Sequence, residues 1–338
     1  MTEVRTKNFF SDETDPYRNL SVEDCLLDLV GEGEIVLFLW RNAETVVIGR
    51  NQNVWSTCKS DLMRAEGVRL ARRYSGGGAV YHDMGNLNFS FIAREGAYNL
   101  QKQYYTVLRS LGRLGINAVL SGRNDIVFEF ADCPLPLKCS GNAFREKDGC
   151  CCHHGTLLVS ADIERMQRYL AVDWEKISSK GVESVSARVG NLSLLRPSIT
   201  AEELADSLIA SFGEVYGVKS EAYSLSLISQ DEISRREQLL RSRDWLYGRR
   251  SECDCEVNKR FSWGAVQIQL RVERGTVAAA QVFSDALDTE FIEAARSSLC
   301  GCEFSGEALS NAFESIGCAD GERRAMSGDI SRLLSERF

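Results

Sequence analysis

The sequence predicts an α+β fold built from a large N-terminal domain and a small C-terminal one. Short strand-like runs and helical runs follow one another without the regular strand–helix alternation of a doubly wound sheet. The 338 residues are enough for two hydrophobic cores. A charged segment over residues 230–258, with room for one helix, separates them. We predict a large domain over residues 1–245, a linker over 246–258 and a small α+β domain over 259–338.

Capping patterns predict where helices begin. Asp15 can cap a helix in which Pro16 takes the first helical position. Thr200-Ala201-Glu202-Glu203 is a capping box, and the helix that it opens is expected to end near Gly213 or Gly217. Further helices are expected over residues 101–114, 163–170 and 288–299, and beyond these up to the C-terminus.

Strands are predicted where short β-branched or aromatic runs lie between Gly, Asn and Asp residues. The N-terminal runs cover residues 35–40, 45–48, 68–73, 79–82, 88–92, 126–130, 138–145 and 156–160. Two more runs, 261–270 and 276–284, read as a pair of strands in the C-terminal domain.

Composition limits the class of protein. The formal net charge is −8 and no long Lys/Arg run occurs, which argues against a nucleic-acid partner. No stretch approaches the roughly 20 apolar residues of a membrane span. The polar, acidic N-terminus is neither a signal nor a transit peptide, so the twelve cysteines predict a cytosolic protein with free thiols. We expect a monomer whose partners are small molecules or proteins.

The most informative segment is Arg72-Arg73-Tyr74-Ser75-Gly76-Gly77-Gly78-Ala79-Val80-Tyr81-His82-Asp83. Three consecutive glycines let several backbone N–H groups approach an anion, and the two arginines add charge suited to carboxylate or phosphate. The segment is not a P-loop, and it lacks the following helix that a dinucleotide fingerprint requires. A flexible hairpin is the alternative interpretation.

Three further segments offer chemical groups. Lys138, at the start of a strand, could direct its ammonium to a carboxylate and a phosphate together, or it could be a solvated surface lysine. Asn124 and Asp125 could hold Mg²⁺ or a ribose, or simply form a turn. His153 and His154 point to opposite faces of a strand, so at most one of them faces a given site. The consecutive cysteines before them do not have zinc-ligand spacing.

Together these segments resemble the lipoate–protein ligase A family. The likeness covers nearly the whole chain and is carried by residues 40–42, 46–53, 72–83, 85–86, 121–125, 138–145, 153–158 and 260–264. Two segments, Cys133-Pro134-Leu135-Pro136 and Cys150-Cys151-Cys152, lie outside the family pattern and receive no role.

The resemblance implies a catalytic domain related to biotin ligases, with mixed sheets and flanking helices, followed by a small accessory domain. It implies that lipoate and Mg-ATP give lipoyl-AMP, and that the lipoyl group then passes to a lysine of an acceptor. The implied acceptors are lipoyl domains of 2-oxoacid dehydrogenase E2 subunits and the glycine cleavage H protein.

The resemblance also assigns residues. Lys138 would be catalytic, and the ATP and lipoyl-AMP site would comprise Arg73, Ser75, Gly76, Gly77, Gly78, Ala79, Val80, Tyr81, His82, Asn86, Asn124, Asp125, Lys138 and His154. Lipoate would contact Lys138, Arg73, Gly78 and His82, and Asp125 is the candidate Mg²⁺ ligand.

Two other functions fit the same sequence features. One is an ATP-independent octanoyl- or lipoyltransferase of the same fold, which would use a cysteine as acyl carrier, with Cys133 nearby. The other is a non-catalytic protein that binds lipoyl domains. The C-terminal domain favours the ligase over the transferase, and Arg73, the glycines and Lys138 favour an enzyme over a scaffold.

Overall fold

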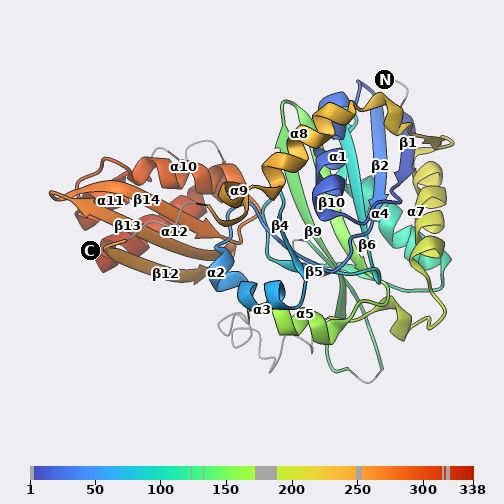
Figure 1. The fold of residues 1–338 in the computed structure, drawn as a ribbon, viewed down its shortest axis with the longest axis horizontal. Coiled ribbons are helices and arrows are strands. Elements are labelled where there is room, and N and C mark those ends of the chain that lie inside the picture. Colours follow the sequence, from blue (N-terminus) through green and yellow to red (C-terminus); the bar gives the residue numbers. More distant parts are fainter. Residues whose placement is uncertain are drawn as a thin grey trace. The chain divides into compact units, whose positions relative to one another are not determined.

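An eight-stranded mixed sheet forms the centre of the N-terminal part of the chain (Figure 1). The computed structural model describes residues 4–122, 124–131, 133–171, 189–248, 253–313, 316 and 320–338. The strand order is β11-β1-β2-β6-β10-β9-β8-β7, with β1 parallel to both of its neighbours and the other pairs antiparallel. The strands are β1 (Arg5–Phe10), β2 (Glu34–Trp40), β6 (Asn86–Arg94), β7 (Val119–Ser121), β8 (Asp125–Phe128), β9 (Leu137–Lys147), β10 (Cys150–Leu158) and β11 (Glu221–Ala222).

The chain divides into two compact units, which are described separately. The first comprises the residues up to Val47, Trp55–Arg72 and Val80–Leu246, and the second comprises Ile48–Val54, Arg73–Ala79 and Tyr247–Phe338. A small sheet of order β4-β3-β5 is formed by β3 (Thr45–Ile48), β4 (Arg69–Arg72) and β5 (Val80–His82), and all of it but Ile48 belongs to the first unit. Two short helices, α2 (Val54–Thr57) and α3 (Ser60–Ala65), lie between β3 and β4 in sequence, and α5 (Ile163–Tyr169) contacts β5.

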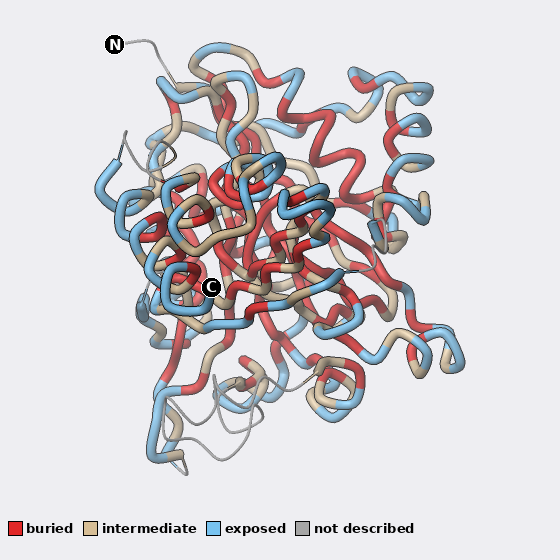
Figure 2. Tube along the Cα trace, turned by 90° about the vertical axis from the view of Figure 1, so that its left-hand side faces the viewer, coloured by how far each residue is buried: buried red, intermediate tan, exposed pale blue. Residues whose placement is uncertain are grey.

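Helices cover both faces of the large sheet. On one face, α4 (Leu100–Arg113) and α7 (Ala201–Tyr216) enclose an apolar core that includes Phe89 and Phe91 of β6. On the other face lies α1 (Pro16–Leu29), and α8 (Gln230–Arg241) packs on α1 and is followed by α9 (Arg243–Tyr247). Buried segments lie toward the inside of the trace and exposed ones toward its outside (Figure 2), and every residue of β2 is buried. Because successive residues of a strand face opposite ways, each central strand contributes to both layers.

The C-terminal residues form a three-stranded antiparallel sheet with helices packed on it. The strands are β12 (Cys255–Phe261), β13 (Gly264–Glu273) and β14 (Thr276–Ser284), and the helices are α10 (Thr289–Leu299), α11 (Gly306–Asn311) and α12 (Gly321–Arg337). A separate core joins them, with Trp263, Ile268 and Phe291 among its members. Within the described residues, no helix is long and apolar enough to span a membrane.

The predicted α+β class is confirmed, and so are the predicted helices and strands. Asp15 caps α1 by accepting from the backbone N–H groups of Tyr17 and Arg18, and Thr200 caps α7 by accepting from Glu203. Of the two predicted ends for α7, Gly217 is the one observed, in the left-handed conformation (φ 72°) that glycine adopts at low cost.

Three features differ from the sequence-based expectation. The polar segment Arg5–Phe10 is a strand of the large sheet, and Cys255–Phe261 is an additional C-terminal strand that pairs with β13. The charged segment after residue 230 begins with α8, for which the sequence left room within the predicted large domain; the helix buries Ile233, Arg236 and Leu240, so it is packed in the first unit rather than solvated. Residues 249–252 lie outside the described chain.

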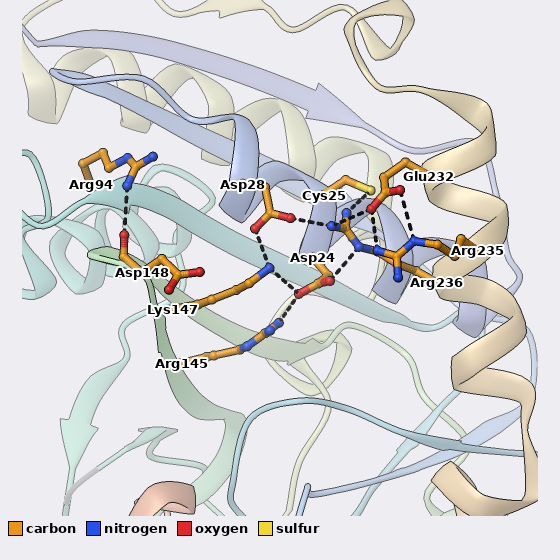
Figure 3. A network of polar contacts seen from close by, with 10 residues as sticks. All are labelled: Asp24, Cys25, Asp28, Arg94, Arg145, Lys147, Asp148, Glu232, Arg235 and Arg236. Atoms are coloured by element: carbon orange, nitrogen blue, oxygen red, sulfur yellow. Dashed lines mark hydrogen bonds and ion pairs between the residues drawn. The ribbon is translucent and has the colours of Figure 1, made fainter.

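An ion-pair network explains why a charged helix packs there (Figure 3). Asp24 on α1 forms ion pairs with Arg236 of α8 at 2.8 Å and with Arg145 of β9 at 2.6 Å. Arg236 also pairs with Asp28 and donates to the Cys25 sulfur. The side chains of Asp24 and Arg236 are each only 7% exposed. The sequence pattern places these charged side chains in solvent, but in the structure they are paired with one another in the protein interior.

Candidate functional site

A β-bulge directs Lys138 toward Asp125. Ile126 pairs with Ser140 but Val127 pairs with Lys138, so Cys139 is an extra residue in β9. Because the extra residue shifts the alternation of side chains, Lys138 lies on the same sheet face as Gly141 and Asp125. The Lys138 Nζ is 2.7 Å from the Asp125 Oδ1, and the two side chains are 36% and 27% exposed. This half-buried ammonium remains accessible to a ligand.

Gly141 provides the space for the Lys138 side chain. A Cβ at this position would lie 2.9 Å from the Lys138 Nζ and 3.1 Å from its Cε. An alanine would therefore displace the flexible end of the lysine rather than the backbone. The backbone N–H of Gly141 donates to the Thr156 hydroxyl on β10, at 3.3 Å, so the strand itself is held in place.

His154 lies on the same face of the sheet and pairs with a buried glutamate. Its Nδ1 is 2.8 Å from the Glu23 Oε1, and the Ser90 hydroxyl donates to the same oxygen at 2.5 Å. Burial raises the pKa of Glu23, but the His154 imidazole and the hydrogen bonds from His154 and Ser90 bring it below its ordinary value. The result is a buried carboxylate that orients His154.

Glu23, Cys152 and His154 also form the one buried group within the described chain whose side-chain types could hold a metal. Their ligand atoms lie within 4.8 Å of one another. Burial holds the pKa of the Cys152 thiol well above its usual value, so it is not a thiolate at neutral pH. Since the three side chains satisfy one another without an ion, we assign no metal there.

The predicted site residues of β5 differ in how far their side chains are buried. His82 is buried, with its Nδ1 3.0 Å from the Asn42 Nδ2 and its ring 5.9 Å from that of Trp40. Tyr81 packs against Tyr169 with ring centroids 5.8 Å apart, so its side chain belongs to the core. Val80 is half-buried.

Asn86, at the start of β6, is fully buried. Its Nδ2 donates to the Asn88 Oδ1 at 3.1 Å, and its backbone N–H donates to the Asp83 carbonyl. Its own Oδ1 has no hydrogen-bond partner among the described residues. A buried acceptor of this kind is costly unless a further donor reaches it, which makes Asn86 a candidate for contact with a ligand or water.

The glycine-rich loop Arg73–Ala79 belongs to the second unit, where Arg73 braces it. The Arg73 Nη2 donates to the carbonyl oxygens of Gly76 at 2.6 Å and of Gly78 at 2.8 Å, and its Nε donates to the Ser75 hydroxyl at 3.0 Å. Arg73 and Ser75 are buried. With its carbonyls turned to the guanidinium, the loop has a fixed shape before any ligand binds.

The glycines of this loop meet different surroundings. A Cβ on Gly76 would overlap the carbonyl oxygen of Ala286 and lie 2.6 Å from that of Leu287, whereas a Cβ on Gly78 would meet nothing within 4 Å. Gly77 has a φ of 88° and donates its N–H to the Ala286 carbonyl at 3.1 Å. Gly76 is thus required by packing, while Gly78 leaves open space beside the backbone.

This contrast predicts opposite behaviour for two alanine variants. Gly76→Ala forces backbone apart and is expected to lower the free energy of unfolding by about 1–3 kcal/mol. Gly78→Ala is expected to change it by less than about 0.5 kcal/mol, and any loss of ligand affinity in that variant would reflect a blocked approach to the loop. Urea denaturation of the two variants measures their stability, and titration of Gly78→Ala with lipoate, the ligand that the sequence resemblance implies, measures the affinity; equal stability would contradict the packing argument.

The predicted site residues therefore fall into two groups. Val80 to His154 are in the first unit, and Arg73 to Ala79 are in the second. Within the first, Asp125 and Lys138 are brought into contact, and Asn124 bonds to Asn142 of β9 through three hydrogen bonds. Arg123 of the same motif lies outside the described residues.

Sequence reasoning missed Glu23, Gly141 and Asn142. Glu23 is distant in sequence from His154, and no local pattern links the two. For Gly141 and Asn142 a signal did exist, since both lie in the Lys138–Arg145 segment whose small and amide side chains had drawn attention to it.

Asp125 does not fit the Mg²⁺ site that the sequence suggested. Its carboxylate is already engaged by the Lys138 ammonium. A divalent cation at the same carboxylate would lie beside that positive charge, and no second acidic group joins Asp125 among the described metal-ligand candidates. We therefore assign Asp125 to holding Lys138 and derive no step through a metal.

The sequence and the structure were compared with known protein families and with solved structures. Residues 15–213 match the family model of the lipoyl protein ligase A/B catalytic domain, and residues 250–334 match that of the bacterial lipoate protein ligase C-terminus. The structure is similar to that of P. falciparum LipL1 in complex with lipoate, with 29% sequence identity over 98% of this chain and 99% of that one and a TM-score of 0.83.

Two other solved structures are similar over about three quarters of the chain. The bipartite lipoate protein ligase of Thermoplasma acidophilum has 26% identity, covering 74% of this chain and 99% of its own, with a TM-score of 0.62. A lipoate-protein ligase A bound with ATP shares the fold, with 24% identity, coverage of 72% and 99%, and a TM-score of 0.60. The catalytic-domain match, the C-terminal match and the fold agree, and the chain belongs to the lipoyl protein ligase A/B family.

Proposed function

We propose that this protein activates lipoate with ATP as lipoyl-AMP and then transfers the lipoyl group to a lysine of an acceptor protein. The observation that carries the proposal is the Lys138 ammonium, held 2.7 Å from Asp125 on a polar sheet face in a member of this family. LipL1 was crystallised with lipoate, a related fold with ATP, and the archaeal system includes an E2 lipoyl domain.

The first step joins two anions. A carboxylate oxygen of lipoate attacks the α-phosphorus of ATP, a new P–O bond forms, and the bond to the β-phosphate bridge breaks to release diphosphate. Fixed cations and N–H donors lower the barrier by neutralising both partners. In our proposal, Lys138 contacts the carboxylate and the α-phosphate, while Arg73 and the loop Ser75–Tyr81, with His82, Asn86, Asn124 and His154, form the ATP and lipoyl-AMP site.

The second step transfers the acyl group. The acceptor amine attacks the carbonyl carbon, a C–N bond forms, the C–O bond to phosphate breaks and AMP leaves, while the nitrogen gives up a proton. Negative charge develops on the carbonyl oxygen, where the Lys138 ammonium would stabilise it. The acceptors that we propose are E2 lipoyl domains and the H protein, and the magnesium that accompanies ATP would be held by its phosphates.

An acceptor-free incubation tests the proposal. The protein is mixed with lipoate and ATP labelled in the α-phosphate, and lipoyl-AMP and diphosphate are measured. Both products are expected, and octanoate in place of lipoate reports chain preference. If neither acid releases diphosphate while an acyl group still passes from a carrier protein to an acceptor, the transferase is correct; if neither reaction occurs, the non-catalytic binding protein is correct.

The cysteines near Lys138 give a separate prediction against the transferase. Burial raises the pKa of the Cys139 thiol to about 12, and its sulfur lies 3.5 Å from the Ile126 carbonyl oxygen, so it carries almost no thiolate at neutral pH. Cys133, half-buried ahead of β9, remains the only nearby candidate in the described chain. The Cys133→Ala/Cys139→Ala double variant is expected to retain ATP-dependent lipoylation within about twofold. Complete loss of acyl transfer in a folded double variant would contradict this.

A further inference from the structure

The buried side chains of Gln103, His153 and Asn142 form a hydrogen-bonded line that leads toward Lys138 from the opposite face of the sheet. His153 lies on β10 beside His154 but faces the core of α4 and α7, where it is fully buried among Phe89, Phe91 and Tyr104. Its Nε2 is 2.9 Å from the Asn142 Oδ1 and its Nδ1 is 3.1 Å from the Gln103 Oε1. Such a polar contact inside an aromatic core is retained only where its hydrogen bonds are made.

The hydrogen bonds fix the tautomer of His153. Burial, followed by the neighbouring His154, lowers the pKa of His153 to about 3, so the ring is neutral and carries one N–H. The Gln103 Nε2 has no partner among the described residues. Turning the Gln103 amide over supplies a donor to Nδ1 and leaves the Nε2–H of His153 to donate to Asn142.

Asn142 connects His153 to the turn that contains Asp125. Its backbone N–H and its Nδ2 both donate to the Asn124 carbonyl at 2.9 Å, and the Asn124 Nδ2 donates back to the Asn142 carbonyl at 2.6 Å. With Oδ1 committed to His153, the Asn142 amide can turn only one way, so its Nδ2 must face Asn124. The next residue is Asp125, which holds the Lys138 ammonium.

Gly155 leaves the space that the hydrogen bond between Asn142 and His153 requires. A Cβ there would lie 2.5 Å from the Asn142 Oδ1 and 2.6 Å from the Phe89 Cζ. Any larger residue opposite Asn142 would push the amide away from His153. The local sequence thus leaves space for this one orientation of the Asn142 side chain.

We infer that His153 is a positioning residue: through Asn142 and Asn124 it fixes Asp125, and through Asp125 the ammonium of Lys138. His153 touches neither Lys138 nor a substrate, and it acts from the far side of the sheet. The part of this inference that concerns catalysis rests on the proposed function; the part that concerns the position of Lys138 does not.

The test compares four variants by the rate at which a small amine-reactive reagent labels Lys138, read by mass spectrometry at fixed pH. Asp125→Asn removes the ion pair directly. His153→Phe keeps the aromatic packing but removes the hydrogen bonds, and His153→Gln restores a donor. Phe212→Leu, in the same core but outside the line, controls for lost stability.

Labelling of Lys138 is expected to rise in Asp125→Asn and His153→Phe alike, to return toward the wild-type rate in His153→Gln, and to stay unchanged in Phe212→Leu. The kcat for lipoyl-AMP formation is expected to fall about tenfold to a hundredfold in His153→Phe, as for a misplacement of about 1 Å, with KM nearly unchanged. If His153→Phe does not fold, Asn142→Ser cuts the line outside the aromatic cluster and is expected to raise labelling in the same way.

The outcomes distinguish a failure of the positioning role of His153 from a failure of the proposed function. Wild-type labelling in His153→Phe or Asn142→Ser, together with a raised rate in Asp125→Asn, overturns the positioning role whatever the enzyme does. An increase in Phe212→Leu equal to that in His153→Phe overturns it too, because the effect is then loss of stability alone. Absence of lipoyl-AMP in the wild type refutes the proposed function and leaves the labelling result to decide on His153.

Discussion

Lys138→Ala is expected to form lipoyl-AMP about 10²- to 10³-fold more slowly than the wild type, which corresponds to roughly 2.7–4 kcal/mol of barrier. The reason is that the variant lacks the fixed positive charge that the β9 bulge turns toward Asp125. The loss is expected mainly in kcat, since the ammonium matters most as the carboxylate and the α-phosphate approach each other. Single-turnover formation of diphosphate, measured without acceptor, gives the rate.

Lys147→Ala is the matched control for this prediction. Lys147 lies on the same strand and is also ion-paired, with Asp28. A general effect of removing a β9 lysine would slow both variants equally. If Lys138→Ala and Lys147→Ala retain the same near-normal rate, Lys138 is not the catalytic cation.

Arg236→Ala is expected to destabilise the protein by about 3–5 kcal/mol, the usual cost of leaving a buried charge without its partner. Arg236 contacts Asp24 at 2.8 Å, both side chains are 7% exposed, and α8 packs on α1 through this pair (Figure 3). Burial works against the charged guanidinium, but Asp24 and its other partners raise the pKa of Arg236 above its ordinary value, so the ion pair persists. Denaturant unfolding followed by far-UV circular dichroism measures the change.

The adjacent Arg235→Ala variant provides the comparison. Arg235 is 66% exposed and pairs with Glu232 one helical turn away. Surface pairs of this kind contribute little, so a change below about 0.5 kcal/mol is expected. Equal losses in the two variants would show that the network in Figure 3 is not the source of the stability of α8.

Local patterns predict the parts of this protein that depend on local physics. The caps at Asp15 and Thr200 specify where α1 and α7 begin because the side chain and the N–H groups that it satisfies lie within three residues. The three glycines after Arg73 indicate a tightly packed loop, and the contact of Gly76 with residues 286–287 gives one reason for a glycine at that position.

Other features need the partner strand or helix. The bulge at Cys139, which determines the face of Lys138, is visible only in the register between β8 and β9. Glu23 and His154 are in contact because α1 packs on β10, and no sequence pattern near either residue predicts this contact. The charges of α8 look like those of a solvated linker until Asp24 is placed beside Arg236.

A crystal structure with bound lipoyl-AMP tests the proposed chemistry most directly. The Lys138 Nζ should lie at hydrogen-bond distance, roughly 2.7–3.2 Å, from both the lipoyl carbonyl oxygen and a phosphate oxygen of the adenylate. An adenylate seated elsewhere, with the Lys138 ammonium still bonded to Asp125 alone and facing water, would contradict the assignment of this lysine and the mechanism derived from it.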